Sequence, residues 1–148
     1  MSRNILITHI TLWVNRAVAL LIVVLFPTFP MLLNWYDGLR SLVGTAHTAL
    51  LIAFYICAVI TLLALWNVDG LLRSILREQI FTEKNVRHIS TVRWCCAAIS
   101  LICIPAAVFY MPLIFMVVIM AFLALIVTVL VRVMRAAVEL REENDLTI

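Results

Sequence analysis

Long runs without a charged residue alternate with short polar segments, and this pattern predicts membrane-spanning helices. No Asp, Glu, Lys or Arg occurs in residues 17–36, 41–68 or 94–131. A helix crosses the hydrocarbon core of a bilayer, about 30 Å thick, with about 20 apolar residues. As one helix the third run would reach about 57 Å at about 1.5 Å per residue, so we expect two spans joined by a turn at residues 110–112. The predicted spans lie near residues 12–34, 45–68, 94–110 and 112–133.

The composition of these runs predicts the fold class. They lack the alternation of apolar and polar residues that a membrane β-barrel requires, and helices satisfy their own backbone groups in lipid. Hydrophobic residues make up 66% of the chain and charged residues 13%, whereas soluble domains are about 25% charged. A nucleic-acid-binding domain, a secreted disulfide scaffold and a disordered tail are therefore excluded. We predict an all-α integral membrane protein, with residues 1–148 forming one four-transmembrane-helix bundle with cytoplasmic helical extensions.

The positions of the basic residues predict the orientation, because cytoplasmic connections carry an excess of Lys and Arg. Ten of the 11 Lys and Arg residues lie before or at the start of the first span, between the second and third spans, or at and beyond the end of the fourth span. Arg40 alone lies on the other side. We expect a multi-pass protein of the cell (inner) membrane with both termini in the cytoplasm.

The connection over residues 69–93 is patterned as an amphipathic hairpin. Its apolar residues recur at helical spacing between charged ones, and Thr82 stands where an N-cap would start a new helix. We expect the second helix to pass beyond the membrane, break near Phe81 and restart as the base of the third span. The hairpin would then lie on anionic lipid headgroups or form a docking face for a cytoplasmic partner. The residues that would bind such a partner are Leu72, Arg73, Ile75, Leu76, Arg77, Phe81, Lys84 and Arg87.

The C-terminal tail, residues 135–148, extends the fourth helix and then becomes acidic. Acidic side chains at a helix C-terminus oppose the helix dipole, so we expect helical order to fade near Glu143. Three interpretations are open. The tail is a frayed solubilising segment, it pairs with the basic hairpin, or its last three residues, Leu-Thr-Ile, are recognised by a partner.

Two segments carry a resemblance to a known family. Residues 80–87, Ile-Phe-Thr-Glu-Lys-Asn-Val-Arg, and residues 140–148, Leu-Arg-Glu-Glu-Asn-Asp-Leu-Thr-Ile, resemble a bacterial family of four-span membrane proteins of unknown function. The resemblance covers nearly the whole chain. It implies no known catalytic activity. Genes of this family often lie beside one for a small cytoplasmic helix-turn-helix regulator, which implies the membrane component of a regulatory pair.

Ionisable residues at membrane depth usually mark transport paths, and few are present here. No Asp, Glu or Lys lies within a predicted span, which argues against a proton-coupled exporter. Arg16 lies one turn into the first span, where it serves as a topology anchor or pairs with Asp69 or Glu139. His47 is expected at the membrane interface. The sequence shows no nucleophile–base pair, metal cluster or phosphate-binding glycine loop, so we predict no catalytic site, no metal and no cofactor.

Small residues recur at every fourth position of the second span and predict a close helix contact. Such residues let two backbones approach in lipid, either within the chain or between copies in a homo-oligomer. The cysteines, at positions 57, 95, 96 and 103, are all expected within or beside the membrane, where a structural disulfide is not expected. The predicted helix-packing residues are Thr45, Ala49, Ala53, Cys57 and Thr61.

Two functions are compatible with these features, and neither is that of an enzyme. The first is a regulatory or scaffolding membrane protein that engages a cytoplasmic, DNA-binding partner through residues 69–93 and 135–148, without itself contacting nucleic acid. The alternative is a small transporter or oligomeric channel, in which backbone carbonyls freed by Pro27, Pro30 and Pro105 line a cavity. The concentration of polar residues on the cytoplasmic side favours the first.

Overall fold

The computed structural model describes residues 2–40, 44–77 and 81–146. They form four helices: α1 (Ser2–Arg40), α2 (Gly44–Leu76), α3 (Glu83–Phe109) and α4 (Leu113–Leu146). Each helix is long and apolar enough to cross a membrane. The predicted all-α architecture with four spanning helices is confirmed. The last two residues of the predicted tail, and residues 78–80 of the predicted hairpin, lie outside the described part of the chain.

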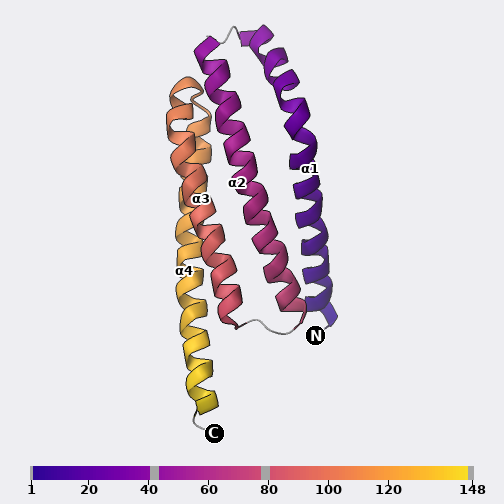
Figure 1. The fold of residues 1–148 in the computed structure, drawn as a ribbon, viewed down its shortest axis with the longest axis vertical. Helices are drawn as coiled ribbons and strands as arrows, with labels where there is room; N and C mark the ends of the chain where they lie inside the picture. Colours follow the sequence, from indigo (N-terminus) through magenta and orange to yellow (C-terminus); the bar gives the residue numbers. More distant parts are fainter. Residues whose placement is uncertain (1, 41–43, 78–80, 147–148) are drawn as a thin grey trace.

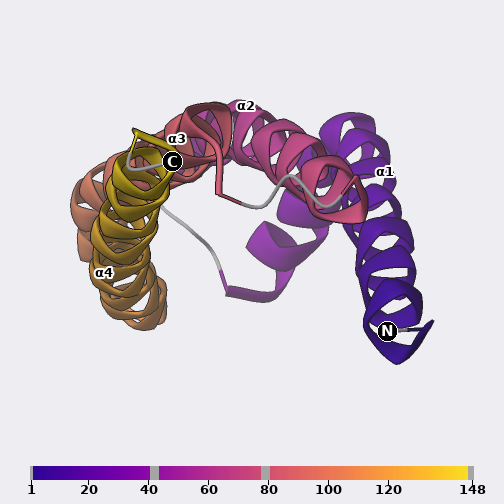
Figure 2. The same cartoon turned by 90° about the horizontal axis from the view of Figure 1, so that it is seen from below.

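The helices lie side by side in chain order and form a single curved layer. Within the described residues, α1 packs on α2, α2 on α3 and α3 on α4, and no other pair of helices is in contact. Figure 1 shows the antiparallel order, and Figure 2 shows the layer from one end as an arc. Because α1 and α4 do not meet, the concave face of the arc stays open along one side.

The two ends of this layer differ in what they carry. Both chain termini and the connection between α2 and α3 lie at one end, which we call the terminal end (Figure 1). The connection between α1 and α2 and the turn at residues 110–112 lie at the opposite end. Helix α3 ends at Phe109 and α4 begins at Leu113, which confirms the predicted division of the long uncharged run.

The break between α2 and α3 falls where the sequence predicts it. Helix α2 ends at Leu76, and α3 begins at Glu83, directly after Thr82 in the N-cap position. The carbonyl of Thr82 accepts the backbone N–H groups of Asn85 and Val86 at 3.1 and 3.2 Å. The Thr82 side chain makes no capping hydrogen bond, so the helix start relies on these backbone bonds.

Helix α4 continues further than the acidic tail predicts. It remains helical to Leu146, whereas we expected helical order to fade near Glu143. The costly step in helix formation is nucleation, and each further residue adds one hydrogen bond. A helix already formed over the membrane span can therefore extend through an unfavourable acidic turn.

A buried apolar core lies in the terminal half, between α2, α3 and α4. Val86 and Ile89 of α3 meet Val131 of α4, and these three side chains are 3–9% exposed. Four partly buried side chains pack around them: Leu71, Val127, Met134 and Val138. This core fixes the bases of α3 and α4 against each other just where their charged extensions begin.

Candidate functional sites

The residues predicted to bind a partner lie at the terminal end, but they differ in accessibility. Arg77, Phe81, Lys84 and Arg87 are exposed. Ile75 and Leu76 are half-buried, and Leu72 is buried at 9% exposure. Of the predicted apolar strip, Phe81 is therefore the side chain that is most available to a partner.

An ion-pair cluster fixes the base of α1 to α2. The Nε of Arg16 donates to Oδ1 of Asp69 at 3.3 Å, and Arg73 donates to Oδ2 of the same carboxylate at 2.7 Å. Asp69 is thus the partner of Arg16, one of the two acidic residues that the sequence indicated. Because Arg73 is engaged in this cluster, its charge is partly neutralised and contributes less to a docking surface.

Amide and imidazole groups add polar contacts that the sequence analysis missed. Buried Asn15 donates from Nδ2 to the carbonyl oxygen of Leu65 at 3.2 Å, which joins α1 to α2. His88 of α3 forms a hydrogen bond with Asn67 of α2 at 2.9 Å. The available signal was the presence of Asn and His near the ends of apolar helices, where polar side chains join neighbouring helices.

A charged cleft of about 330 Å³ lies between the base of α3 and the extension of α4. The α3 wall contributes Glu83 and Arg87, and the α4 wall contributes Arg135, Glu139 and Glu142. Basic and acidic side chains of the predicted hairpin and tail therefore line the same cleft. Val86, Ser90 and Val138 complete the lining.

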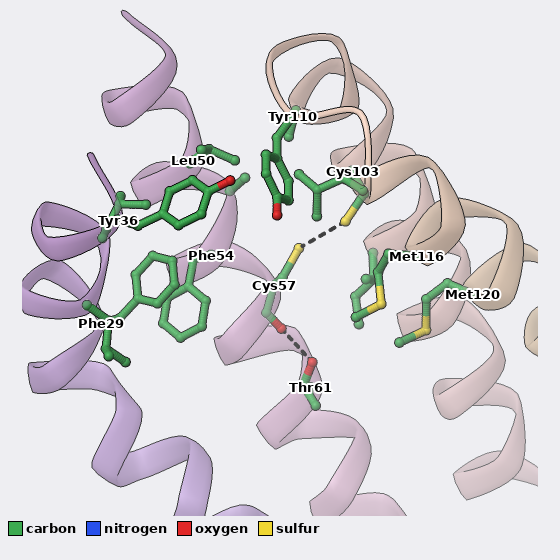
Figure 3. A pocket seen from close by; sticks show the side chains of 16 residues that line it. Phe29, Tyr36, Leu50, Phe54, Cys57, Thr61, Cys103, Tyr110, Met116 and Met120 are labelled. Atoms are coloured by element: carbon green, nitrogen blue, oxygen red, sulfur yellow. Dashed lines mark hydrogen bonds between the residues drawn. The ribbon is translucent and has the colours of Figure 1, made fainter. Parts of the chain in front are cut away.

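An apolar cavity of about 390 Å³ lies in the concave face of the layer and is lined by all four helices. Three members of the predicted helix-packing stripe, Ala53, Cys57 and Thr61, form part of its wall, and Figure 3 shows the last two. Ala49 is half-buried and Thr45 is exposed. The structure therefore places the middle of the stripe beside a cavity.

Aromatic and sulfur-containing side chains shape this cavity. Phe29 of α1 stacks on Phe54 of α2 with ring centroids 3.6 Å apart. The rings of Tyr36 and Tyr110 meet edge to face at 5.9 Å.

The thiols of Cys57 and Cys103 lie 3.9 Å apart in the same wall, and Thr61 donates to the Cys57 carbonyl at 2.7 Å (Figure 3). All four cysteines are free thiols. Among the described residues, no group of three or more His, Cys, Asp and Glu side chains is placed to hold a metal ion.

Four long apolar helices with charged extensions at one end define a multi-pass membrane protein. Residues 10–148 match the family described as "Protein of unknown function (DUF2975)", and the chain belongs to that family. Comparison with curated proteins and with solved structures gave no match.

Proposed function

We propose that this chain is a regulatory or scaffolding membrane protein that holds a cytoplasmic partner at its terminal end. The observation that carries the proposal is the charged surface built there by α3, α4 and the connection between α2 and α3. Exposed Arg77, Phe81, Lys84 and Arg87, together with Glu139 and Glu142 of the neighbouring cleft, form what we call the docking surface. It combines one exposed aromatic side chain with charges of both signs, which suits specific contact with a folded protein.

The proposal includes the orientation and the membrane. Ten of the 11 Lys and Arg residues belong to the terminal end, and such a bias favours the cytoplasmic side of a bacterial inner membrane. Both termini and the docking surface would then face the cytoplasm. Only the connection between α1 and α2 and the turn at residues 110–112 would face outward, and they leave little protein there to bind a large ligand.

Cysteine labelling tests this orientation in intact cells. Gly38→Cys, near the opposite end, should react with an impermeant maleimide added outside. Glu83→Cys and Asp145→Cys should react only after permeabilisation. The four native cysteines can be replaced by Ser so that a single site is followed at a time. Labelling of Glu83→Cys from outside would contradict the orientation and remove the docking surface from the cytoplasm.

A small helix-turn-helix regulator is the partner class that we propose. Its support is the resemblance of residues 80–87 and 140–148 to a family whose genes often lie beside such a regulator. The chain itself would not contact nucleic acid. Its role would be to hold or release the regulator at the membrane, so that the regulator's access to DNA depends on the membrane protein.

Co-purification from the native host tests the docking surface. The double variant Arg77→Glu/Arg87→Glu should recover about tenfold less of a small DNA-binding protein than the wild type, equivalent to about 1.4 kcal/mol. Arg3→Glu/Arg132→Glu is a matched control, because both residues are exposed and the same number of basic residues remains. Equal recovery from both double variants would exclude the docking surface from partner binding.

The alternative function, a small transporter or oligomeric channel, is supported by the apolar cavity in the concave face. A transporter of this kind would move an apolar solute, since the lining is almost entirely hydrocarbon, aromatic and sulfur-containing. Accumulation of a lipophilic dye in cells that lack the chain, compared with cells that express it, separates the two functions. A difference that persists in Arg77→Glu/Arg87→Glu would favour transport.

A further inference from the structure

The apolar cavity occupies only part of the membrane thickness. Along α2 its lining runs from Leu50 to Thr61, about 16 Å at about 1.5 Å per residue. That is about half of a hydrocarbon core about 30 Å thick. An occupant of the cavity therefore needs the length of one lipid leaflet and not that of a transmembrane helix.

The cavity is also narrow. Its volume of about 390 Å³ is spread over a length of about 16 Å. A hydrocarbon chain is about 4–5 Å thick, because nonbonded carbon atoms approach to about 4 Å. The length and the volume are those of a site for one extended chain.

The chemistry of the wall changes along its length. Tyr36 and Tyr110 lie towards the opposite end of the layer, and Figure 3 shows both hydroxyl groups directed into the space between the helices. Tyrosine favours the membrane interface, where its ring is buried and its hydroxyl meets polar groups. Further inside, Phe54, Met116 and Met120 provide an apolar wall with adaptable methionine side chains.

We propose that this cavity is a binding site for a single-chain amphiphile. One acyl chain extends from the level of Tyr36 and Tyr110 to the level of Thr61. An uncharged head that accepts hydrogen bonds meets the hydroxyl of Tyr36. The volume also lies within the range of about 300–1,000 Å³ that is typical of small-molecule sites. This site does not depend on the docking surface, so loss of partner capture would leave it unaffected.

The native cysteines provide a direct test. Cys57 and Cys103 line the cavity, whereas half-buried Cys96 is outside its lining. The purified protein, in phosphatidylcholine nanodiscs, is treated with N-ethylmaleimide while monopalmitoylglycerol is added. The modification rate at Cys57 should fall at least about fivefold and reach a plateau, and the rate at Cys96 should stay unchanged. No change at Cys57, or equal slowing at both cysteines, would overturn the proposal.

A second test fills the cavity with a phenylalanine ring, placed separately on two of the helices that line it. Ala53→Phe on α2 and Met116→Phe on α4 each place a ring in the cavity, so one variant suffices if the other does not fold. Ile52→Phe and Val118→Phe are matched controls, because both native side chains are more than half exposed on the same two helices. A monoacylglycerol with a diazirine in its chain should label cavity-lining peptides in the wild type and the controls. Labelling should fall about tenfold in the filled variants, and equal labelling in all five proteins would contradict the site.

Competition between the photoreactive monoacylglycerol and unlabelled lipids identifies which class of lipid the cavity binds. Unlabelled monopalmitoylglycerol should abolish the photolabelling, whereas added phosphatidylcholine should not. Stronger competition by palmitate would overturn the uncharged head. Loss of labelling on raising the phosphatidylcholine content alone would assign the cavity to ordinary bilayer lipid. Cross-linking between copies through Met116→Cys would show that a second copy covers the cavity, which would also overturn the proposal.

Discussion

The terminal half of the helical layer carries a buried apolar core beside a charged cleft, whereas the opposite half surrounds an apolar cavity. In the terminal half, Val86, Ile89 and Val131 form a buried core, and Asp69 forms ion pairs with two arginines. In the opposite half, aromatic pairs and thiols line an apolar space. Lipid is as apolar as the side chains, so helices in a membrane are held by packing and hydrogen bonds. Buried side chains and ion pairs can therefore hold the helices together beside an open cavity.

Truncating one apolar side chain in each half should give the largest difference in stability between the two halves. Ile89→Ala removes packing from the buried core and should lower the free energy of unfolding by about 2 kcal/mol or more. Leu50→Ala only enlarges an existing cavity and should cost less than half as much. Thermal unfolding in a mild detergent measures both. Equal losses would show that the opposite half is as closely packed as the terminal half.

Enlarging a small side chain should distinguish a helix contact from a cavity wall. Ala58 is 6% exposed, and Ala58→Leu should cost about 1–3 kcal/mol through overpacking. Ala53→Leu, which extends into the cavity, should cost little. Unfolding of the two variants in the same detergent makes the comparison. A larger loss for Ala53→Leu would mean that Ala53, and not Ala58, lies in the close helix contact.

The spans were predictable from the sequence because crossing a membrane depends on local composition. Uncharged runs of sufficient length specify a helix whatever its neighbours are. The length of the third run required a turn, and Pro112, which suits the first position of a helix, indicated residues 110–112 as its place. The pairing of Arg16 with Asp69 was predictable as one of two choices, since both residues lie near the same membrane face. The capping position of Thr82 was predictable from its local pattern.

The cavity was not predictable, because it depends on how the helices are arranged. The four-residue spacing of Ala49, Ala53 and Cys57 indicates a face of α2, but small residues occur both at close contacts and in cavity walls. Which of the two applies depends on side chains from other helices, such as Tyr36 and Tyr110. No local sequence pattern indicates whether α1 and α4 are in contact. The burial of Leu72 likewise follows from the packing of neighbouring helices.

Removing the Asp69 carboxylate, which Arg16 and Arg73 share, should lower the stability of the protein moderately. Asp69→Ala leaves Arg16 and Arg73 without this acceptor and should destabilise by about 1 kcal/mol, since both arginines are partly exposed to solvent. Raising the salt concentration should reduce the difference from the wild type. Asp145→Ala, in the exposed tail, is the control and should change nothing measurable. No difference between the two variants would show that the cluster does not stabilise the junction of α1 and α2.

Alanine substitutions at two glycines should give the smallest difference in stability. A Cβ at Gly70 would lie 3.3 Å from the ring of His88, which Asn67 holds by a hydrogen bond, whereas a Cβ at Gly38 would meet nothing within 4 Å. Alanine in a helix is favoured over glycine by about 1 kcal/mol. Gly38→Ala should show most of this gain, and Gly70→Ala should show little or none. Equal stabilisation would mean that α3 can move away from α2 at no cost.

Partner capture by three chains at matched expression tests most directly whether the two halves have separate roles. The chains are the wild type, the double variant Arg77→Glu/Arg87→Glu at the docking surface, and the cavity-filled variant Ala53→Phe. We predict that the small DNA-binding partner is recovered equally with the wild type and Ala53→Phe, and about tenfold less with the double variant. Full recovery with the double variant, or loss of the partner from Ala53→Phe alone, would contradict the separation of roles.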